Sequence, residues 1–395
     1  MSDPVRPHER FLVFGAPLIG DEEIGEIVDS LRGGWLGTGP KVARFEADFR
    51  DYVGAAHAVA VSSCTAALHL SLLALELEPG AEVITSALTF CATVNAIIHS
   101  GATPVLADID PRTQNLDAAS VAAAVTSRTR ALVPVHFAGR PCDMTALGEL
   151  CDRHGLALVE DCAHAVETTC QGRHAGTFGD FGCFSFYVTK NVVTGEGGMV
   201  LARDEGHAAR IKTLALHGMS ADAWKRFSDE GYRHYLVREA GFKYNMTDLQ
   251  AALGIHQLAR VEDNWRRRAA LWRRYQDELC GLPIELPAEP VPGTRHAHHL
   301  YTIGVGEDHA GMTRDAFLEA MTRENVGVGV HYVAVPEHPF YQEAFGWRPE
   351  AWPLASAVGR RTVSLPLSAK LSDADVDDVI TAVRRVLSRG AGRAS

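Results

Sequence analysis

Short apolar runs alternate with helical patterns through the first two thirds of the chain. Near-continuous apolar strands that are separated by helices are typical of a mainly parallel sheet covered on both faces. The runs that predict strands are residues 58–62, 82–85, 104–107, 131–137 and 157–160, and helical patterns follow two of them at 65–77 and 92–99. The pattern therefore predicts an α/β core.

After about residue 250 the pattern changes. A long helical pattern covers residues 249–282, a proline-rich break follows at 286–292, and an apolar, strand-like run covers 298–305. A last helix is predicted over residues 373–387. Ser372 would be its N-cap, with acidic residues in the first turn and arginines near the end, as the helix dipole favours.

The length of the chain allows more than one domain. With 395 residues, 46% of them hydrophobic, the protein can bury a core large enough for about two domains. We expect a large domain over residues 14–254 and a smaller C-terminal α+β domain over residues 255–395. Residues 1–13 would form an N-terminal arm.

Charge and cysteine content narrow the classes of function. A net charge of −11 without a basic tail argues against nucleic acid or an anionic membrane as the main partner. The eight cysteines form no CxxC pair, so we predict neither a zinc site nor a disulfide framework, and we expect no metal. The sequence has no apolar stretch of the ~18 residues that a membrane-spanning helix needs, and its start has no apolar signal segment. We expect a cytoplasmic protein.

Lys190 has the most distinctive surroundings among the six lysines of the chain. It follows a run of Phe, Ser and Tyr and enters a glycine-rich turn. An amine among apolar neighbours loses hydration, which lowers its pKa and favours the neutral, nucleophilic form. The alternative is a lysine that extends from a strand end into solvent.

Asp161 ends an apolar strand at the edge where open α/β sheets bind ligands. A carboxylate there would pair with the protonated ring nitrogen of a bound cofactor. At about 4 Å and an effective dielectric constant near 20, such a pair is worth about 4 kcal/mol. His164, one helical turn further on, would contact the same ring. The alternative for Asp161 is a helix N-cap.

A turn rich in Ser and Thr follows the first predicted strand, at residues 62–67. A strand that leads into a helix offers backbone N–H groups to a phosphate. The alternative is an ordinary helix cap, since the turn lacks the glycines and lysine of a P-loop. Phe90, at the end of another strand, could stack on a flat ligand, and the alternative is a core position.

Seven ordered motifs carry a resemblance to a known family. They are SSCTAALHL, SALTFCATVNAI, GATPVLADID, PVHFAGRPCDM, LVEDCAHA, FSFYVTKNVVTGEGG and GFKYNMTDLQAALG. Their order and spacing resemble those of the DegT/DnrJ/EryC1 family of nucleotide-sugar aminotransferases, enzymes of fold type I that depend on pyridoxal phosphate (PLP). The resemblance covers residues 14–387.

The resemblance implies roles for individual residues. Lys190 would bind the cofactor covalently, Asp161 would pair with its ring nitrogen, and His164 would lie near its oxygen. The further cofactor contacts implied are Ser63, Cys64, Thr65 and Ala66 in the phosphate turn, Ser185 on the phosphate, and Phe90 on the ring.

Two implied features concern the subunit and the turn. Asn245 matches an asparagine that in this family reaches the phosphate of the neighbouring subunit, which implies a homodimer with shared active sites.

At the position of Cys64 the family more often has glycine. Cys64 would be strained if the turn needs a positive φ at that position.

The resemblance also implies a reaction. L-glutamate would donate the amino group, and Lys190, once released from the cofactor, would act as the general base that moves the proton. A related branch of the family has histidine at this position and dehydrates sugars. Lys190 therefore favours transamination.

The expected substrate is a nucleotide-linked keto sugar. Residues 34–42, 217–226, 330–332 and 339–341 resemble the branch that aminates C4 of dTDP-4-keto-6-deoxyglucose or a close relative, in deoxysugar biosynthesis for an antibiotic or a surface glycan. The candidate substrate contacts are Lys225, Arg226, Lys243, His331 and Tyr332. The alternatives are an enzyme that aminates C3, an amino-cyclitol aminotransferase, and a non-catalytic regulator that binds PLP.

Overall fold

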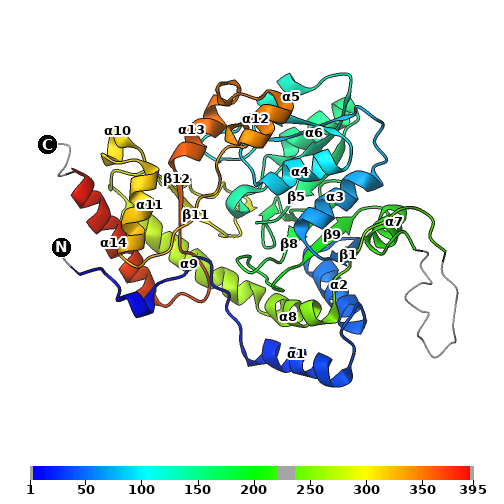
Figure 1. The fold of residues 1–395 in the computed structure, drawn as a ribbon, viewed down its shortest axis with the longest axis horizontal. Helices are drawn as coiled ribbons and strands as arrows, with labels where there is room; N and C mark the ends of the chain where they lie inside the picture. Colours follow the sequence, from blue (N-terminus) through cyan, green and yellow to red (C-terminus); the bar gives the residue numbers. More distant parts are fainter. Residues whose placement is uncertain (1–2, 220–235, 392–395) are drawn as a thin grey trace.

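The structure is a computed structural model that describes residues 3–219 and 236–391. A seven-stranded sheet lies at its centre, in the order β1-β9-β8-β5-β4-β2-β3 (Figure 1). The strands are β1 (His57–Val61), β2 (Glu82–Ser86), β3 (Thr103–Ala107), β4 (Thr129–Val133), β5 (Ala157–Asp161), β8 (Phe181–Ser185) and β9 (Gly198–Ala202). β9 is antiparallel to both of its neighbours, and the other pairs are parallel. The predicted mainly parallel sheet is confirmed, and β9 is a strand that the apolar pattern did not predict.

Helices cover both faces of this sheet. Successive side chains of a strand point to opposite faces and therefore contact different helices. Val83 packs in a cluster with α3, α4 and α7, whereas its neighbour Ile84 packs in a cluster with α5 and α6. Next to that second cluster, α2 and α8 cover β1, β8 and β9. The helices are α1 (Asp21–Gly33), α2 (Pro40–Val53), α3 (Cys64–Ala74), α4 (Cys91–His99), α5 (Ala118–Ala124), α6 (Met144–His154), α7 (Glu205–Ala215) and α8 (Asp248–Ala259).

The C-terminal part has an apolar core of its own. The antiparallel pair of β11 and β12 packs with α9, α11 and α14 in one cluster. The elements of this part are α9 (Val261–Leu279), β11 (Tyr301–Gly304), α10 (Glu307–Ala310), α11 (Arg314–Arg323), α12 (Pro339–Phe345), α13 (Pro353–Arg361), β12 (Thr362–Leu365) and α14 (Asp373–Ala391). A small sheet of β6 (Thr169–Cys170), β7 (Arg173–His174) and β10 (Thr294–Arg295) joins the two parts.

The long helix predicted from residue 249 to 282 is in fact two helices, α8 and α9. Arg260 stands between them with non-helical dihedral angles, φ −110° and ψ 14°. Its guanidinium binds Glu23 and the carbonyl of Leu18, so contacts with the N-terminal segment favour the break. The predicted domain boundary after residue 254 falls inside α8, and the division into two domains stays a prediction.

The N-terminal arm lies against the last helix, as Figure 1 shows. Arg6 is buried and forms ion pairs with Asp375 and Asp378 of α14 at 2.8 and 2.7 Å. Leu12 forms a bridge with Val326 and packs into the C-terminal core. Among the described residues, no helix is long and apolar enough to cross a membrane.

Candidate active site

The carboxyl ends of β1, β5 and β8 meet at one edge of the sheet. Asp161 ends β5 and is paired in register with Cys183 of β8. Gly198 of β9 is paired with both Ser185 of β8 and Val61 of β1, so β1 and β8 run in the same direction. This register brings Asp161, Ser185 and the turn after β1 to the edge where open α/β sheets bind ligands.

The predicted phosphate turn opens helix α3. Ser63 is its N-cap, and the Ser63 hydroxyl accepts a hydrogen bond of 3.1 Å from the backbone N–H of Ala66. The first N–H groups of a helix have no partner within the helix and can bind an anion. A Cβ atom at Gly198 would lie 2.5 Å from the carbonyl carbon of Ser63 and 2.7 Å from the nitrogen of Cys64. Glycine is therefore needed where β9 passes the turn.

Cys64 fits this turn without backbone strain. It is the first residue of α3, and it is not among the residues with positive φ. The extended backbone of Ser63, with φ −168° and ψ 163°, makes the change of direction instead. The strain that the sequence suggested for a cysteine in place of glycine is therefore absent.

Asp161 is buried and held by two hydrogen bonds. Its Oδ2 accepts a bond of 2.8 Å from the hydroxyl of Thr93, and its Oδ1 accepts one of 3.1 Å from the backbone N–H of Ala163. Burial raises the pKa of Asp161 although both hydrogen bonds and the nearby Lys190 lower it. A cationic group beside Asp161 would favour its ionised form, which is the condition that a protonated ring nitrogen supplies.

Lys190 lies in the turn after β8, where its backbone N–H binds the carbonyl of Tyr187 at 2.8 Å. Burial lowers the pKa of Lys190 to about 8, against the opposing effect of Cys64 and Asp161. About a tenth of this amine is therefore neutral at pH 7, far more than for an ordinary lysine, and the neutral form is the one that attacks a carbonyl group.

His164 is fixed by its two ring nitrogens. Its Nδ1 accepts a hydrogen bond of 3.2 Å from the backbone N–H of Ala138, and its Nε2 lies 3.0 Å from the hydroxyl of Tyr332. Burial, and then the charge of Lys190, lower the pKa of His164 well below its usual value. The neutral ring therefore carries its hydrogen on Nε2, and this N–H group donates a hydrogen bond to the hydroxyl oxygen of Tyr332.

Two more predicted residues complete this cluster. His331 lies next to Tyr332, with ring centroids 5.0 Å apart, and its Nδ1 is 2.8 Å from the hydroxyl of Ser364. Burial, and then the charge of Lys190, lower the pKa of His331 to about 4. The ring of Phe90 is 55% exposed and lies 5.6 Å from that of Tyr332. An open aromatic face therefore borders the site.

The sequence matches the profile of the DegT/DnrJ/EryC1/StrS aminotransferase family over residues 17–384. The chain belongs to this family. A curated relative, the spore coat polysaccharide biosynthesis protein SpsC of Bacillus subtilis (strain 168), is 50% identical over 384 residues, which are 97% of this chain and 99% of SpsC. The family and the aminotransferase class predicted from the motifs are confirmed.

Solved structures agree with this membership of the DegT/DnrJ/EryC1/StrS family. The putative sugar aminotransferase Spr1654 from Streptococcus pneumoniae, in its apo form, has a TM-score of 0.90 and 31% identity over 97% of this chain and 99% of its own. Spr1654 was also solved in PMP and PLP forms. DesI, solved in the presence of its TDP-sugar product, has a TM-score of 0.86 and 33% identity over 98% of this chain and 95% of its own. Fold type I and PLP as the cofactor are thereby confirmed.

Not every predicted site residue of this family member lies in the cluster. Lys243 is exposed and forms a backbone bridge with Leu216. Lys225 and Arg226 lie outside the described residues. Asn245 is bridged to Val61 at the start of the phosphate turn, and its amide nitrogen donates a 2.7 Å hydrogen bond to Thr38.

Sequence reasoning missed residues that come from distant elements. Thr93 of α4 binds Asp161, and the ring of His299 lies 4.5 Å from that of His164. The sequence offers a signal for His299, because His296, His298 and His299 form a dense group before β11. Nothing in the sequence shows which of these three reaches the site.

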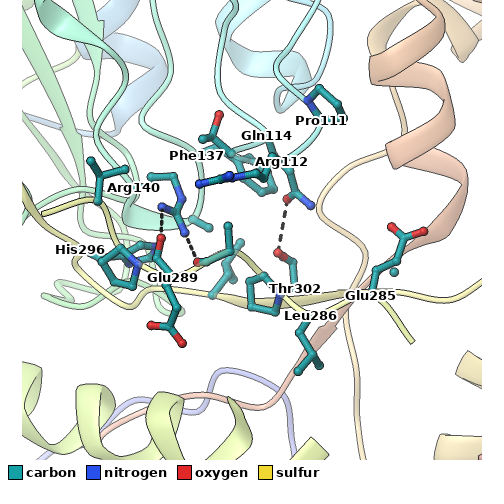
Figure 2. A pocket seen from close by; sticks show the side chains of 18 of the residues that line it. Pro111, Arg112, Gln114, Phe137, Arg140, Glu285, Leu286, Glu289, His296 and Thr302 are labelled. Atoms are coloured by element: carbon teal, nitrogen blue, oxygen red, sulfur yellow. Dashed lines mark hydrogen bonds between the residues drawn. The ribbon is translucent and has the colours of Figure 1, made fainter. Parts of the chain in front are cut away.

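Two pockets flank the cluster. One of about 600 Å³ is lined by aromatic side chains that include Phe90 and Tyr332. The other has a volume of about 790 Å³ and is lined in part by Phe137 and Ala138. The backbone N–H of Ala138 donates the hydrogen bond to His164. Figure 2 shows this second pocket, with Arg140 turned toward the backbone carbonyls that it binds. None of the predicted site residues lines it.

A buried group of His136, Glu160 and Cys162 has its potential ligand atoms within 4.8 Å of one another. The carboxylate of Glu160 already accepts hydrogen bonds from the backbone N–H groups of residues 176, 178 and 179 and from His136 Nε2. His136 Nδ1 in turn accepts one from the backbone of Cys142. This group therefore holds loops together around the end of β5.

Proposed function

We propose that this enzyme transfers an amino group from L-glutamate to C4 of a dTDP-linked 4-keto-6-deoxy sugar, with Lys190 and Asp161 as its central catalytic residues. The observation that carries the proposal is the shared position of these two side chains. Both lie at the carboxyl edge of the sheet, and Lys190 has a pKa of about 8. A neutral amine and a buried carboxylate at one ligand-binding edge are the pair that PLP chemistry needs.

The donor set at this edge fits PLP. The phosphate would lie at the N-terminus of α3, where helix N–H groups and the dipole favour an anion. Asp161 would face the ring nitrogen, His164 the ring oxygen, and Phe90 one face of the ring. The residues proposed for the phosphate are Ser63, Cys64, Thr65, Ala66 and Ser185. When bound, PLP supplies an electrophilic carbonyl carbon and an electron-withdrawing ring.

Side chains of the protein would hold the cofactor, move the proton and donate hydrogen bonds. Neutral Lys190 holds the cofactor through its Nζ and, once released, takes a proton from the donor's Cα and returns it on the cofactor side. Asp161 keeps the ring nitrogen protonated, an interaction of about 4 kcal/mol at ~4 Å and an effective dielectric constant near 20. The hydroxyl oxygen of Tyr332 accepts a hydrogen bond from Nε2–H of His164, which leaves the hydroxyl hydrogen of Tyr332 free to donate to a substrate oxygen.

The substrate assignment is supported by relatives. DesI was solved with a TDP-sugar product, and SpsC is named for the biosynthesis of a spore coat polysaccharide. Because identity to SpsC reaches 50%, we favour a surface glycan over an antibiotic as the destination of the sugar. All eight cysteines are free thiols, which is consistent with the proposed cytoplasmic location.

We also propose a homodimer with shared sites. Asn245 has a buried Oδ1 that has no hydrogen-bond partner among the described residues, and large apolar side chains are exposed around α1. These exposed residues are Leu18, Ile19, Ile24, Leu31, Trp35 and Leu36. Contiguous exposed apolar side chains mark interaction surfaces, and a second copy of the chain would cover them.

Mixing two inactive variants tests the shared site. If Asn245 serves the partner's site, dimers formed from Lys190→Ala and Asn245→Ala chains each contain one site with both residues intact. Activity should return to about a quarter of the wild-type value after the subunits exchange at random. A mixture that stays as inactive as its components would show that Asn245 acts within its own chain.

The first experiment on function is an amino-transfer assay. Purified protein is incubated with PLP, L-glutamate and a panel of 3-keto and 4-keto nucleotide sugars, and 2-oxoglutarate and the product's NMR spectrum are recorded. An amine at C4 is the expected result. An amine at C3 would overturn the position, and a bound cofactor without turnover on any sugar would favour an amino-cyclitol substrate or a regulatory role.

A further inference from the structure

A buried chain of polar side chains runs from α9 to the active site. Arg268 of α9 forms an ion pair with Glu167, and both side chains are almost fully buried, at 3% and 0% exposure. The other carboxylate oxygen of Glu167 accepts a hydrogen bond of 2.7 Å from the amide nitrogen of Asn191. The chain ends at His299, whose Nδ1 lies 3.0 Å from Oδ1 of Asn191.

This chain fixes the orientation of the Asn191 amide. The Asn191 nitrogen faces the carboxylate of Glu167 and, at 3.1 Å, the backbone carbonyl of Ala297. Both partners can only accept hydrogen bonds, so the amide must present its NH₂ group to them. Oδ1 of Asn191 is then left to face His299 and can only accept.

The orientation of Asn191 in turn sets the tautomer of His299. Since Oδ1 accepts, Nδ1 of His299 must carry a hydrogen. Burial, and then the charge of Lys190, lower the pKa of His299 well below its usual value, so the ring is neutral and has one N–H group. Its Nε2 therefore carries a lone pair.

That lone pair lies in the active-site cluster. The ring of His299 is 4.5 Å from that of His164, and Asn191 directly follows Lys190 in the chain. Nε2 of His299 has no hydrogen-bond partner in the part of the chain that the structure describes, and it is not among the polar atoms sealed from solvent. Both nitrogens of His164 are engaged. For His331, the hydroxyl partner on Nδ1 can donate or accept, so its tautomer is not fixed.

We propose that the Arg268–Glu167–Asn191 chain holds His299 with Nε2 as a lone pair, and that the side-chain amine of Lys190, which makes no hydrogen bond to this nitrogen in the structure, turns to donate one to it. The proposal depends on the proposed function in one respect only, because that function gives Lys190 its role as the amine that binds the cofactor. His299 would orient the amine before it binds the cofactor and after its release. Glu167 and Asn191 are positioning residues in this arrangement, because they act through His299.

Nitrogen NMR on the apoprotein tests the tautomer without any activity. Protein labelled with ¹⁵N-histidine should show His299 with a protonated Nδ1 and an unprotonated Nε2, and the signal is assigned by its loss in His299→Gln. The opposite tautomer in the wild-type protein would overturn the proposal.

Glu167→Gln tests the chain with a side chain of equal size. Arg268 needs an acceptor, so the new amide would turn its oxygen to Arg268 and its NH₂ group to Asn191. Asn191 would then turn over, although the carbonyl of Ala297 favours its present orientation, present its own NH₂ group to His299, and move the ring proton of His299 to Nε2. We expect this change of tautomer in the spectrum, with the circular dichroism of the wild type and unchanged His331 signals as controls. An unchanged His299 tautomer would mean that the carbonyl of Ala297 alone fixes the Asn191 amide, and would overturn the role of Glu167 and Arg268.

Lys190→Met tests the hydrogen bond itself. Methionine has a similar length and no N–H group, so the ¹⁵N resonance of His299 Nε2 should move toward the value of a free lone pair. A resonance that does not move would overturn the contact with Lys190. Because all three measurements use the apoprotein, their failure is distinct from failure of the amino-transfer assay, which would leave the tautomer results standing.

Discussion

The hydroxyl of Thr93 donates a 2.8 Å hydrogen bond to the carboxylate of Asp161 and so ties the first turns of α4 to the end of β5. Thr93 is itself buried and lies 2.9 Å from the hydroxyl of Thr89. This contact orients the carboxylate that we propose for the ring nitrogen of PLP. It also opposes the effect of burial on the pKa of Asp161.

Thr93→Val should slow the reaction by about 10- to 150-fold while PLP remains bound. Valine keeps the shape but removes the donor, and a hydrogen bond to a charged group is worth about 1.5–3 kcal/mol. Asp161→Asn, which removes the charge itself, should cost considerably more. Single-turnover kinetics with glutamate measure both rates. Thr93→Ser keeps the donor and should restore most of the rate; if it is as slow as Thr93→Val, packing rather than the hydrogen bond is responsible.

Lys190→Ala should reduce turnover by about a thousandfold or more, since it removes both the covalent anchor and the general base. The absorbance of the covalently bound cofactor should disappear, whereas circular dichroism should stay that of the wild type. Lys370→Ala, at an exposed lysine far along the chain, is the matched control and should behave like the wild type. An active Lys190→Ala enzyme would show that another amine carries the cofactor.

The rate at which the apoprotein binds PLP covalently should rise with pH and level off above about pH 8. Burial lowers the pKa of Lys190 to about 8, so the neutral, reactive amine is the minor form below this pH and the major form above it. Stopped-flow absorbance across pH 6–10 measures this dependence. A rate that continues to rise toward pH 10 would mean that Lys190 titrates like an ordinary exposed lysine.

Gly198→Ala should weaken PLP binding and destabilise the fold by about 1–3 kcal/mol, the usual cost of overpacking. The added methyl group would collide with the backbone of Ser63 and Cys64 and push the phosphate turn away from β9. Cofactor titration and urea unfolding measure the two effects. Gly148→Ala in α6, where a Cβ meets no atom within 4 Å, is the control; alanine there should be neutral or stabilising because it favours helix more than glycine does.

The sequence indicated the positions of the candidate site residues that lie at or soon after the end of a strand, while their roles stay predictions. Asp161, Lys190 and the turn at Ser63 could be placed because apolar runs reveal strands, and the ends of parallel strands share one edge. Periodicity carries no information about pairing between distant segments. It therefore missed the contact of Thr93 with Asp161, the antiparallel β9, and the break at Arg260, where a side chain bound to a remote helix competes with local helix propensity.

The contact of Arg6 with α14 has a consequence for biosynthesis. The arm is made long before its partner α14. At roughly 5–20 residues per second, α14 follows Arg6 by about half a minute. Until α14 is made, the apolar side chain of Leu12 has no completed core to enter, so this arm is a segment that a nascent-chain chaperone could hold until α14 emerges.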